Sequence, residues 1–193
     1  MPEDPQFARL VMLACHDLRT PLATVHGFAH TLARTEDLDG TTARYVEMIN
    51  AAATQLAELI DDLSVSARLA GDRYDPPLQT VDTMELAHSA AERLGDERVL
   101  VSGEGAEVEL DAEAAERAVG SLARCALRHG GLEEVELAVR GQELALSPVT
   151  PASAPVLLGE DLRDLGAAVA VRVVRARGGS VAVEGETLTI RFT

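Results

Sequence analysis

The chain has 193 residues, a formal net charge of −15 and no lysine, so all its cationic side chains apart from histidine are arginines. A protein this acidic repels nucleic-acid backbones and anionic lipid, and we therefore expect neither nucleic-acid binding nor membrane binding. No apolar run is long enough to span a bilayer and the N-terminus does not resemble a signal peptide, whereas 47% apolar residues suffice for a core; a cytoplasmic globular protein is expected.

The sequence pattern of residues 1–70 predicts two long helices. Asp4 before Pro5 is typical of an N-cap followed by the first helical residue, and a second helix is predicted from near Thr41 to a C-cap at Gly71. In both segments apolar residues recur at alternating steps of three and four, which is the heptad spacing of packed helices. These positions are Val11, Cys15, Leu18, Leu22, Val25, Ala29 and Leu32, then Tyr45, Ile49, Ala52, Leu56, Leu59, Leu63 and Ser66.

The matched lengths of these helices predict an antiparallel hairpin. Each helix has about 30 residues and is therefore about 45 Å long, and the polar segment 35–40 is short enough to join neighbours. One hairpin alone leaves an apolar stripe in water. We therefore expect two copies to pair into a four-helix bundle, which makes the protein a homodimer.

After a linker at 72–77, the pattern changes to short strands mixed with helices. The clustering of strands between helices favours an α+β sandwich, with one sheet covered on one face by helices. The proline-rich loop 148–160 is predicted to be mobile. The predicted elements are strand 78–82, helix 83–94, strands 98–102 and 107–110, helix 112–129, strands 133–139 and 142–147, helix 161–177, and a hairpin of strands 180–184 and 187–192.

A histidine in the first helix is the strongest chemical signal of the sequence. If Cys15 and Leu18 lie in the heptad seam, then His16 points into solvent, with Asp17 beside it and Thr20 one turn further on. A neutral imidazole nitrogen is a good nucleophile toward phosphorus, and an exposed one can enter another protein's active site. In this interpretation Asp17 holds the imidazole tautomer or accepts its proton. The alternative for an isolated histidine is an ordinary surface residue.

The string His-Asp-Leu-Arg-Thr-Pro-Leu at 16–22 resembles the H box of sensor histidine kinases of the HisKA type. The resemblance implies that residues 1–71 form a dimerisation and histidine-phosphotransfer hairpin, and that residues 78–193 form a kinase-like ATP-binding domain. The second half matches mainly in the order and spacing of its segments, at 108–111, 126–129 and 178–184.

The sequence lacks most of the residues that would bind nucleotide in the ATP-binding domain that this resemblance implies. The family's paired asparagines align with Ser121 and Cys125, and the only asparagine of the chain is Asn50 in the second hairpin helix. The adenine-reading loop aligns with 147–151, which contains no glycine, and a phosphate-binding glycine is replaced by Asp164, although Gly166 remains. We therefore expect a degenerate domain that does not bind ATP, and a protein with no cofactor or metal of its own.

Such a domain arrangement resembles kinase-derived histidine phosphotransferases of bacterial phosphorelays. The resemblance implies that His16 accepts a phosphoryl group from the aspartate of one response-regulator receiver domain and passes it to another, with Mg²⁺ supplied by the receiver. The predicted docking surface comprises Arg19, Thr20, Ala23, Thr24 and Gly27 with the facing part of the second helix. Two alternatives remain open: a response-regulator phosphatase in which Asp17 and Thr20 act with water, and a non-catalytic pseudokinase scaffold.

Other polar residues carry weaker signals. His26 and His30 are four residues apart, but no third ligand completes a metal site, and they are interpreted as solvated surface. Asp61 and Asp62 are interpreted in the same way. His129 is predicted to interact with the dipole at the end of its helix, and Cys125 to be a packing residue.

Overall fold

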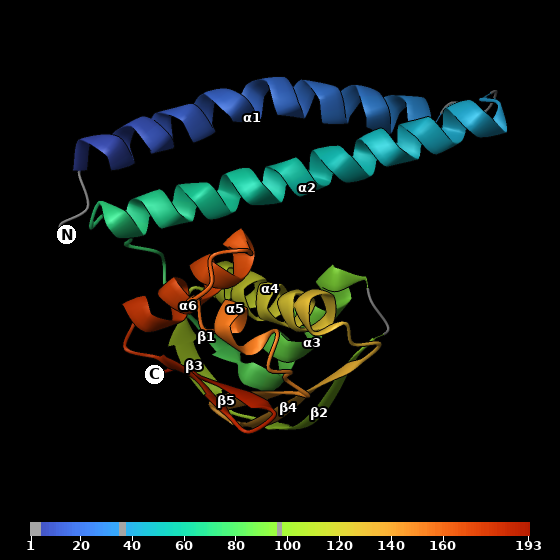
Figure 1. Ribbon diagram of the computed structural model, residues 1–193. Helices are drawn as coiled ribbons and strands as arrows, with labels where there is room; N and C mark the ends of the chain where they lie inside the picture. The colour runs from blue at the N-terminus through green and yellow to red at the C-terminus, as the bar shows by residue number, and fades with distance from the viewer. Residues whose placement is uncertain (1–4, 35–37, 96–97) are drawn as a thin grey trace. The chain divides into compact units, whose positions relative to one another are not determined.

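The computed structural model describes residues 5–34, 38–95 and 98–193 (Figure 1). The chain divides into two compact units, a helical unit of residues 1–74 and a sheet-containing unit of residues 75–193. No helix within the described ranges is both long and apolar enough to cross a membrane.

The helical unit is a hairpin of α1 (Pro5–Ala33) and α2 (Gly40–Ala70), which confirms the two predicted helices. Asp39 caps α2, because its carboxylate accepts hydrogen bonds from the backbone N–H groups of Thr41 and Thr42 at 2.9 and 3.0 Å. The hydrogen bond from the Thr42 hydroxyl contributes most to lowering the pKa of Asp39 below its usual value. The predicted cap at Asp4 lies outside the described residues.

The interface between the two helices is narrow and built from small side chains. Ala8, Cys15 and Ala29 of α1 are buried, as are four residues of α2, Val46, Ala53, Val65 and Ala67. Other apolar residues of the heptad pattern remain exposed to solvent: Leu18, Val25 and Leu32 are 50%, 48% and 47% exposed in the single chain. The hairpin therefore buries only part of the apolar stripe that its sequence encodes.

In the sheet-containing unit, three helices cover one face of a five-stranded sheet (Figure 1). The strand order is β2-β4-β5-β7-β6, in which β2 and β4 are parallel and the remaining pairs are antiparallel. The helices of this layer are α3 (Thr83–Leu94), α4 (Ala112–Gly130) and α6 (Leu165–Ala176), and the strands of the sheet are β2 (Val99–Gly105), β4 (Val135–Gly141), β5 (Glu143–Ser147), β6 (Ser180–Glu184) and β7 (Thr187–Arg191).

The core of this unit lies between the helices and the sheet and consists of aliphatic side chains. Leu122 of α4 belongs to the same buried cluster as Leu137, Leu144, Leu188 and Ile190 of the strands. All five side chains are shielded from solvent almost completely. Because large aromatic residues are rare in this chain, branched aliphatic packing supplies the main stabilisation.

Ile190 in β7 tests the strength of this packing. Its replacement by alanine removes buried methyl groups and leaves a cavity, so we expect Ile190→Ala to lower the free energy of unfolding by about 2–5 kcal/mol. The shift of the urea unfolding transition measures this change. Thr189→Ala, on the neighbouring half-buried position of the same strand, is the control and should cost about 1 kcal/mol or less. Equal effects of the two changes would contradict the assigned core.

The prediction of a single sheet was wrong. β1 (Gln79–Asp82) and β3 (Glu107–Leu110) form a separate two-stranded antiparallel sheet, with Gln79 opposite Leu110. Both strands are short because helices begin next to them. Asp82 at the end of β1 caps α3, and Asp111 directly after β3 caps α4.

The segment 148–160 is packed rather than loose, which the loop prediction did not anticipate. It contains the short helix α5 (Ala154–Leu157), and Val149, Val156 and Leu157 join the core. The next helix was predicted from residue 161 but begins at Leu165. Asp164 fixes this start, since its Oδ1 accepts a hydrogen bond from the Ala167 backbone N–H at 3.0 Å.

Candidate functional site

His16 is held on the outside of the hairpin by the burial of its neighbour. The Cys15 side chain is fully buried, and successive helical residues are rotated by about 100°. The His16 side chain consequently points away from the interface and is 78% exposed. Its exposure follows the sequence prediction and leaves the imidazole accessible to another protein.

Asp17 is the polar neighbour of the imidazole. The His16 Nδ1 and Asp17 Oδ1 atoms are 3.3 Å apart. In the tautomer with its proton on Nδ1, the ring donates that proton to the carboxylate and presents the lone pair of Nε2 to solvent. This arrangement can leave Nε2 as a nucleophile, with a negative charge placed to stabilise a positive charge on the ring.

An ion pair between the two helices lies close to His16 in the sequence. The Arg19 Nη2 of α1 donates to the Asp61 Oδ1 of α2 at 2.8 Å. Asp61 was interpreted as part of a solvated acidic face, and this interpretation missed its pairing, because charges 42 residues apart give no local signal. Both side chains are more than one-third exposed, so the pair contributes at most about 1 kcal/mol to stability.

The remaining predicted residues lie on or beside the exposed face that carries His16. Thr20, Ala23 and Gly27 follow His16 at helical spacings of four, seven and eleven, and all are exposed. Thr24 lies at the edge of this face and donates its hydroxyl proton to the Thr20 carbonyl at 3.1 Å. We call His16, Arg19, Thr20, Ala23, Thr24 and Gly27 the histidine face.

Apart from His16 and Arg19, the histidine face consists of small, exposed residues. A Cβ atom added at Gly27 would meet no other heavy atom within 4 Å, so the surface is open there. Pro21 lies inside α1 and has no N–H to bond to the Asp17 carbonyl, which loosens the helix one turn after His16. The imidazole therefore stands above a surface that a partner can approach closely.

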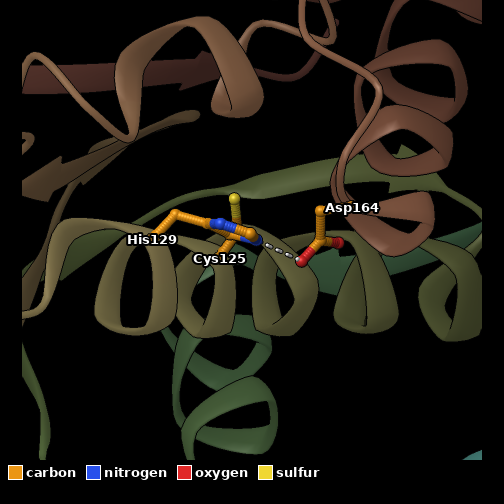
Figure 2. Close-up of side chains that lie close together, drawn as sticks. All are labelled: Cys125, His129 and Asp164. Atoms are coloured by element: carbon orange, nitrogen blue, oxygen red, sulfur yellow. Dashed lines mark hydrogen bonds and ion pairs between the residues drawn. The ribbon is translucent and has the colours of Figure 1, made fainter.

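A second polar cluster lies between α4 and α6 in the sheet-containing unit. The His129 Nε2 and Asp164 Oδ2 atoms are 3.2 Å apart, and each side chain is 16% exposed (Figure 2). His129 does lie in the last turn of α4, but the sequence interpretation missed its pairing with Asp164. Cys125, one turn before His129, is buried beside this pair.

The Cys125 thiol does not have the properties of a nucleophile. Burial raises its pKa to about 12, and the negative charge of Asp164 adds to this effect. A thiol with this pKa keeps its proton near neutrality, whereas reactive cysteines are thiolates. The cluster is therefore not an activated cysteine–histidine pair.

Cys125 and Asp164 also occupy positions at which the family resemblance implies a nucleotide site, so their surroundings show whether a nucleotide would fit there. Ser121 and Cys125, where the family resemblance places asparagines, lie on α4, and Cys125 is turned into the core. The start of α6 is already capped by the Asp164 carboxylate. A bound phosphate at this helix start would meet a negative charge, so these residues do not fit an ATP site of the family's kind.

The hairpin is similar in sequence to a known protein family. Residues 8–71 match the family model of the His Kinase A (phospho-acceptor) domain. The sensor protein DivL of Caulobacter vibrioides is 32% identical over 78 residues, a segment that is 40% of this chain and 10% of DivL. The match therefore concerns a small part of a much longer protein.

Solved structures of histidine kinases share the fold of the whole chain. Full-length ShkA in complex with AMPPNP superposes with a TM-score of 0.64 at 22% identity, over 94% of this chain and 44% of the ShkA chain. The Acinetobacter baumannii histidine kinase AdeS gives a TM-score of 0.56 at 16% identity, over 92% of this chain and 97% of its own. At these identities the likeness establishes the fold alone.

Proposed function

Because the chain carries a His Kinase A (phospho-acceptor) domain, followed by a domain with the fold of a histidine-kinase ATP-binding domain, we propose that it is a histidine phosphotransferase of a two-component phosphorelay. His16 is the proposed phosphoryl carrier between receiver domains of response regulators. The observation that carries the proposal is the exposed His16 imidazole, with its Nδ1 held 3.3 Å from the Asp17 carboxylate.

In the proposed reaction, the Nε2 lone pair of His16 attacks the phosphorus of an aspartyl phosphate on the first receiver. The N–P bond forms while the P–O bond to the receiver aspartate breaks, and its oxygen leaves as part of a carboxylate. Asp17 stabilises the positive charge that develops on the imidazole. The reverse reaction with a second receiver transfers the phosphoryl group onward and restores neutral His16.

The receiver supplies the remaining catalytic groups, including its own Mg²⁺. Phosphoryl transfer depends mostly on positioning and charge stabilisation, so the present chain needs to contribute little beyond its nucleophile and a docking surface. The histidine face supplies that surface. Its open area at Ala23 and Gly27 lets a receiver approach His16, and Arg19 offers a cation at its edge.

We further infer that ATP takes no part in the reaction. Asn50, the only asparagine of the chain, lies on α2 and cannot serve the nucleotide site that the resemblance implies. Asp164 places a carboxylate at the start of α6, where its charge repels phosphate. These features support a phosphotransferase that is loaded by another protein over an autokinase.

Dimerisation is part of the same proposal. In the single chain Leu18, Val25 and Leu32 of α1 are about half exposed, as are Ile49 and Leu56 of α2, and Leu63 is 38% exposed. Each set repeats every seven residues, which is the pattern of a helical bundle. We call these six residues the apolar stripe and propose that it packs against a second copy in a four-helix bundle.

Transfer of labelled phosphate tests the proposed function. A panel of receiver domains, each carrying radiolabelled aspartyl phosphate, is mixed with the full chain, and the labelled proteins are separated by electrophoresis. The proposal predicts that at least one receiver passes label to this chain in acid-labile, base-stable form. Loss of receiver label as free phosphate, without label on the chain, would instead favour a phosphatase. No exchange with a complete panel would favour a scaffold.

Asp17 and Arg19 should affect different parts of this transfer. Asp17→Asn removes the charge beside the ring, so we expect the maximal transfer rate to fall about tenfold while the half-saturating receiver concentration changes little. Arg19→Ala changes the docking surface, and we expect the half-saturating concentration to rise instead. Rapid-quench transfer assays over a range of receiver concentrations measure both quantities. Identical effects of the two changes would contradict the assigned roles.

A further inference from the structure

The cluster of Cys125, His129 and Asp164 brings together three side chains of metal-ligating type. One ligand atom from each lies within 4.8 Å of the others, and in the described part of the chain no other group of three is this close. Cys125 and His129 are four residues apart on α4 and therefore share one helix face. Asp164 comes from the residue before α6 and faces them (Figure 2).

We propose that Cys125, His129 and Asp164 form a Zn²⁺ site that joins α4 to the start of α6. The proposal is independent of the chemistry of His16. It rests on the type, spacing and burial of these three residues.

The donor atoms match zinc in kind. A thiolate sulfur, an imidazole nitrogen and a carboxylate oxygen are the three ligand types that Zn²⁺ accepts, whereas Mg²⁺ and Ca²⁺ prefer oxygen alone. A thiolate and a carboxylate together supply two negative charges, which balance the charge of one Zn²⁺. This donor set is therefore selective for zinc over the alkaline-earth cations.

The distances are compatible with a metal after a small adjustment. Nitrogen and oxygen ligands of a tetrahedral zinc ion lie about 3.4 Å from each other. The His129 Nε2 and Asp164 Oδ2 atoms are already 3.2 Å apart. The Cys125 sulfur lies within 4.8 Å of a ring nitrogen of His129 and of a carboxylate oxygen of Asp164, so it has to move closer to these ligand atoms by about 1 Å for all three to bind one zinc ion.

The surrounding structure holds the ligands without closing the site. Asp164 uses its Oδ1 to cap α6, so its Oδ2 is the atom that faces His129. Cys125 forms the buried floor, while the side chains of His129 and Asp164 are each 16% exposed. Zinc can therefore enter from the His129–Asp164 side, and a water molecule can fill the fourth position.

Metal binding releases one proton. The S–H bond of Cys125 breaks, a sulfur–zinc bond forms, and that proton passes to solvent. The proton that His129 Nε2 donates to Asp164 moves through solvent to Nδ1, so that the neutral imidazole binds zinc through the lone pair of Nε2. Burial and the negative charge of Asp164 raise the pKa of the Cys125 thiol, and Arg128 and Arg163 lower it only in part, so the metal itself has to displace the thiol proton. Arg163 is itself paired with Asp161 at 2.7 Å, which reduces its repulsion of the metal.

Zinc content and cobalt spectroscopy test this site in the full chain. The protein is incubated with Zn²⁺, dialysed against metal-free buffer and analysed for bound metal, and a second sample is loaded with Co²⁺. We expect about one zinc per chain, a thiolate-to-cobalt charge-transfer band, and a rise in Tm of the sheet-containing unit by about 10 °C at zinc concentrations a hundredfold above Kd.

Matched variants separate this site from other metal binding. Cys125→Ser should abolish the charge-transfer band, whereas Cys15→Ser should retain it, and these two are the only cysteines of the chain. His129→Gln and Asp164→Asn should lower zinc affinity at least about tenfold, and asparagine preserves the cap of α6. The double variant His26→Gln/His30→Gln should keep its zinc, because that exposed pair lies on α1.

The proposal fails if the wild-type chain retains no more zinc than Cys125→Ser. It also fails if the cobalt band persists in Cys125→Ser and disappears in Cys15→Ser. Should Cys125→Ser not fold, as judged by circular dichroism, the His129→Gln and Asp164→Asn variants decide the matter. Unchanged zinc affinity in both would show that the cluster is a hydrogen-bonded group only.

Discussion

The variant His16→Gln should accept no phosphoryl group from any receiver. Glutamine can form hydrogen bonds but has no nucleophilic nitrogen, so the N–P bond cannot form. We expect labelling of the chain to fall at least about a hundredfold, to background, in the receiver-transfer assay. The fold should be unaffected, because the His16 side chain is 78% exposed and makes no buried contact.

His26→Gln is the matched control for this variant. It makes the same substitution on the same helix at another exposed histidine, and it should be labelled like the wild type. Undiminished labelling of His16→Gln would place the phosphoryl group on a different residue and remove the basis of the proposed function. Loss of labelling in both variants would point to a general effect on α1.

The variant Leu56→Glu should convert the protein from a dimer to a monomer. Leu56 lies in the middle of the apolar stripe on α2 and is 51% exposed in the single chain. In a two-fold dimer each substitution acts twice. The loss of about 2 kcal/mol of apolar burial per chain raises the dimer Kd about a thousandfold before the cost of burying the carboxylate is added.

Size-exclusion chromatography with light scattering measures this change directly. Ala51→Glu introduces the same charge on α2 at an exposed position outside the apolar stripe, and it should remain dimeric. A wild-type chain that is monomeric at micromolar concentration would contradict the proposed bundle. So would a dimer that persists in Leu56→Glu with unchanged affinity.

The predicted elements succeeded where a local signal determined the structure. Asp82 caps α3 and Asp111 caps α4, and the sequence placed both helix starts correctly. The heptad pattern likewise gave both long helices. The exposure of His16 followed from the same pattern, because it depends only on which neighbour is buried.

The predictions failed where distant segments determine the structure. The pairing of β1 with β3 joins residues about 30 positions apart, and nothing in either four-residue strand shows that it leaves the main sheet. In segment 148–160 the proline content indicated a loop, but the burial of Val156 and Leu157 depends on the core that surrounds them. Local composition does not encode that environment.

In the candidate sites too, the features set by nearby residues were predictable, whereas those that depend on distant segments were not. The residues of the histidine face lie within twelve consecutive positions, so a helical periodicity sufficed to group them. The ion pair between Arg19 and Asp61 and the pair between His129 and Asp164 each connect separate elements. Of the zinc ligands that we propose, only the spacing of Cys125 and His129 was available as a sequence signal.

The chain combines a hairpin that matches a phospho-acceptor family model with a domain that has the fold of a histidine-kinase ATP-binding domain. His16 and its carboxylate neighbour Asp17 lie in a geometry suited to nucleophilic attack. The region that the resemblance assigns to nucleotide instead contains a buried thiol, a histidine and a carboxylate. The identity of the phosphoryl donor, a receiver or ATP, therefore distinguishes the proposed phosphotransferase from an autokinase.

A comparison of two donors on one preparation of the protein tests that point most directly. The full chain is incubated with labelled ATP and Mg²⁺ in one reaction, and with a labelled, phosphorylated receiver and Mg²⁺ in the other. We expect acid-labile label on His16 from the receiver and none from ATP. Label from ATP that disappears in His16→Gln would contradict the proposed phosphotransferase and identify the protein as an autokinase.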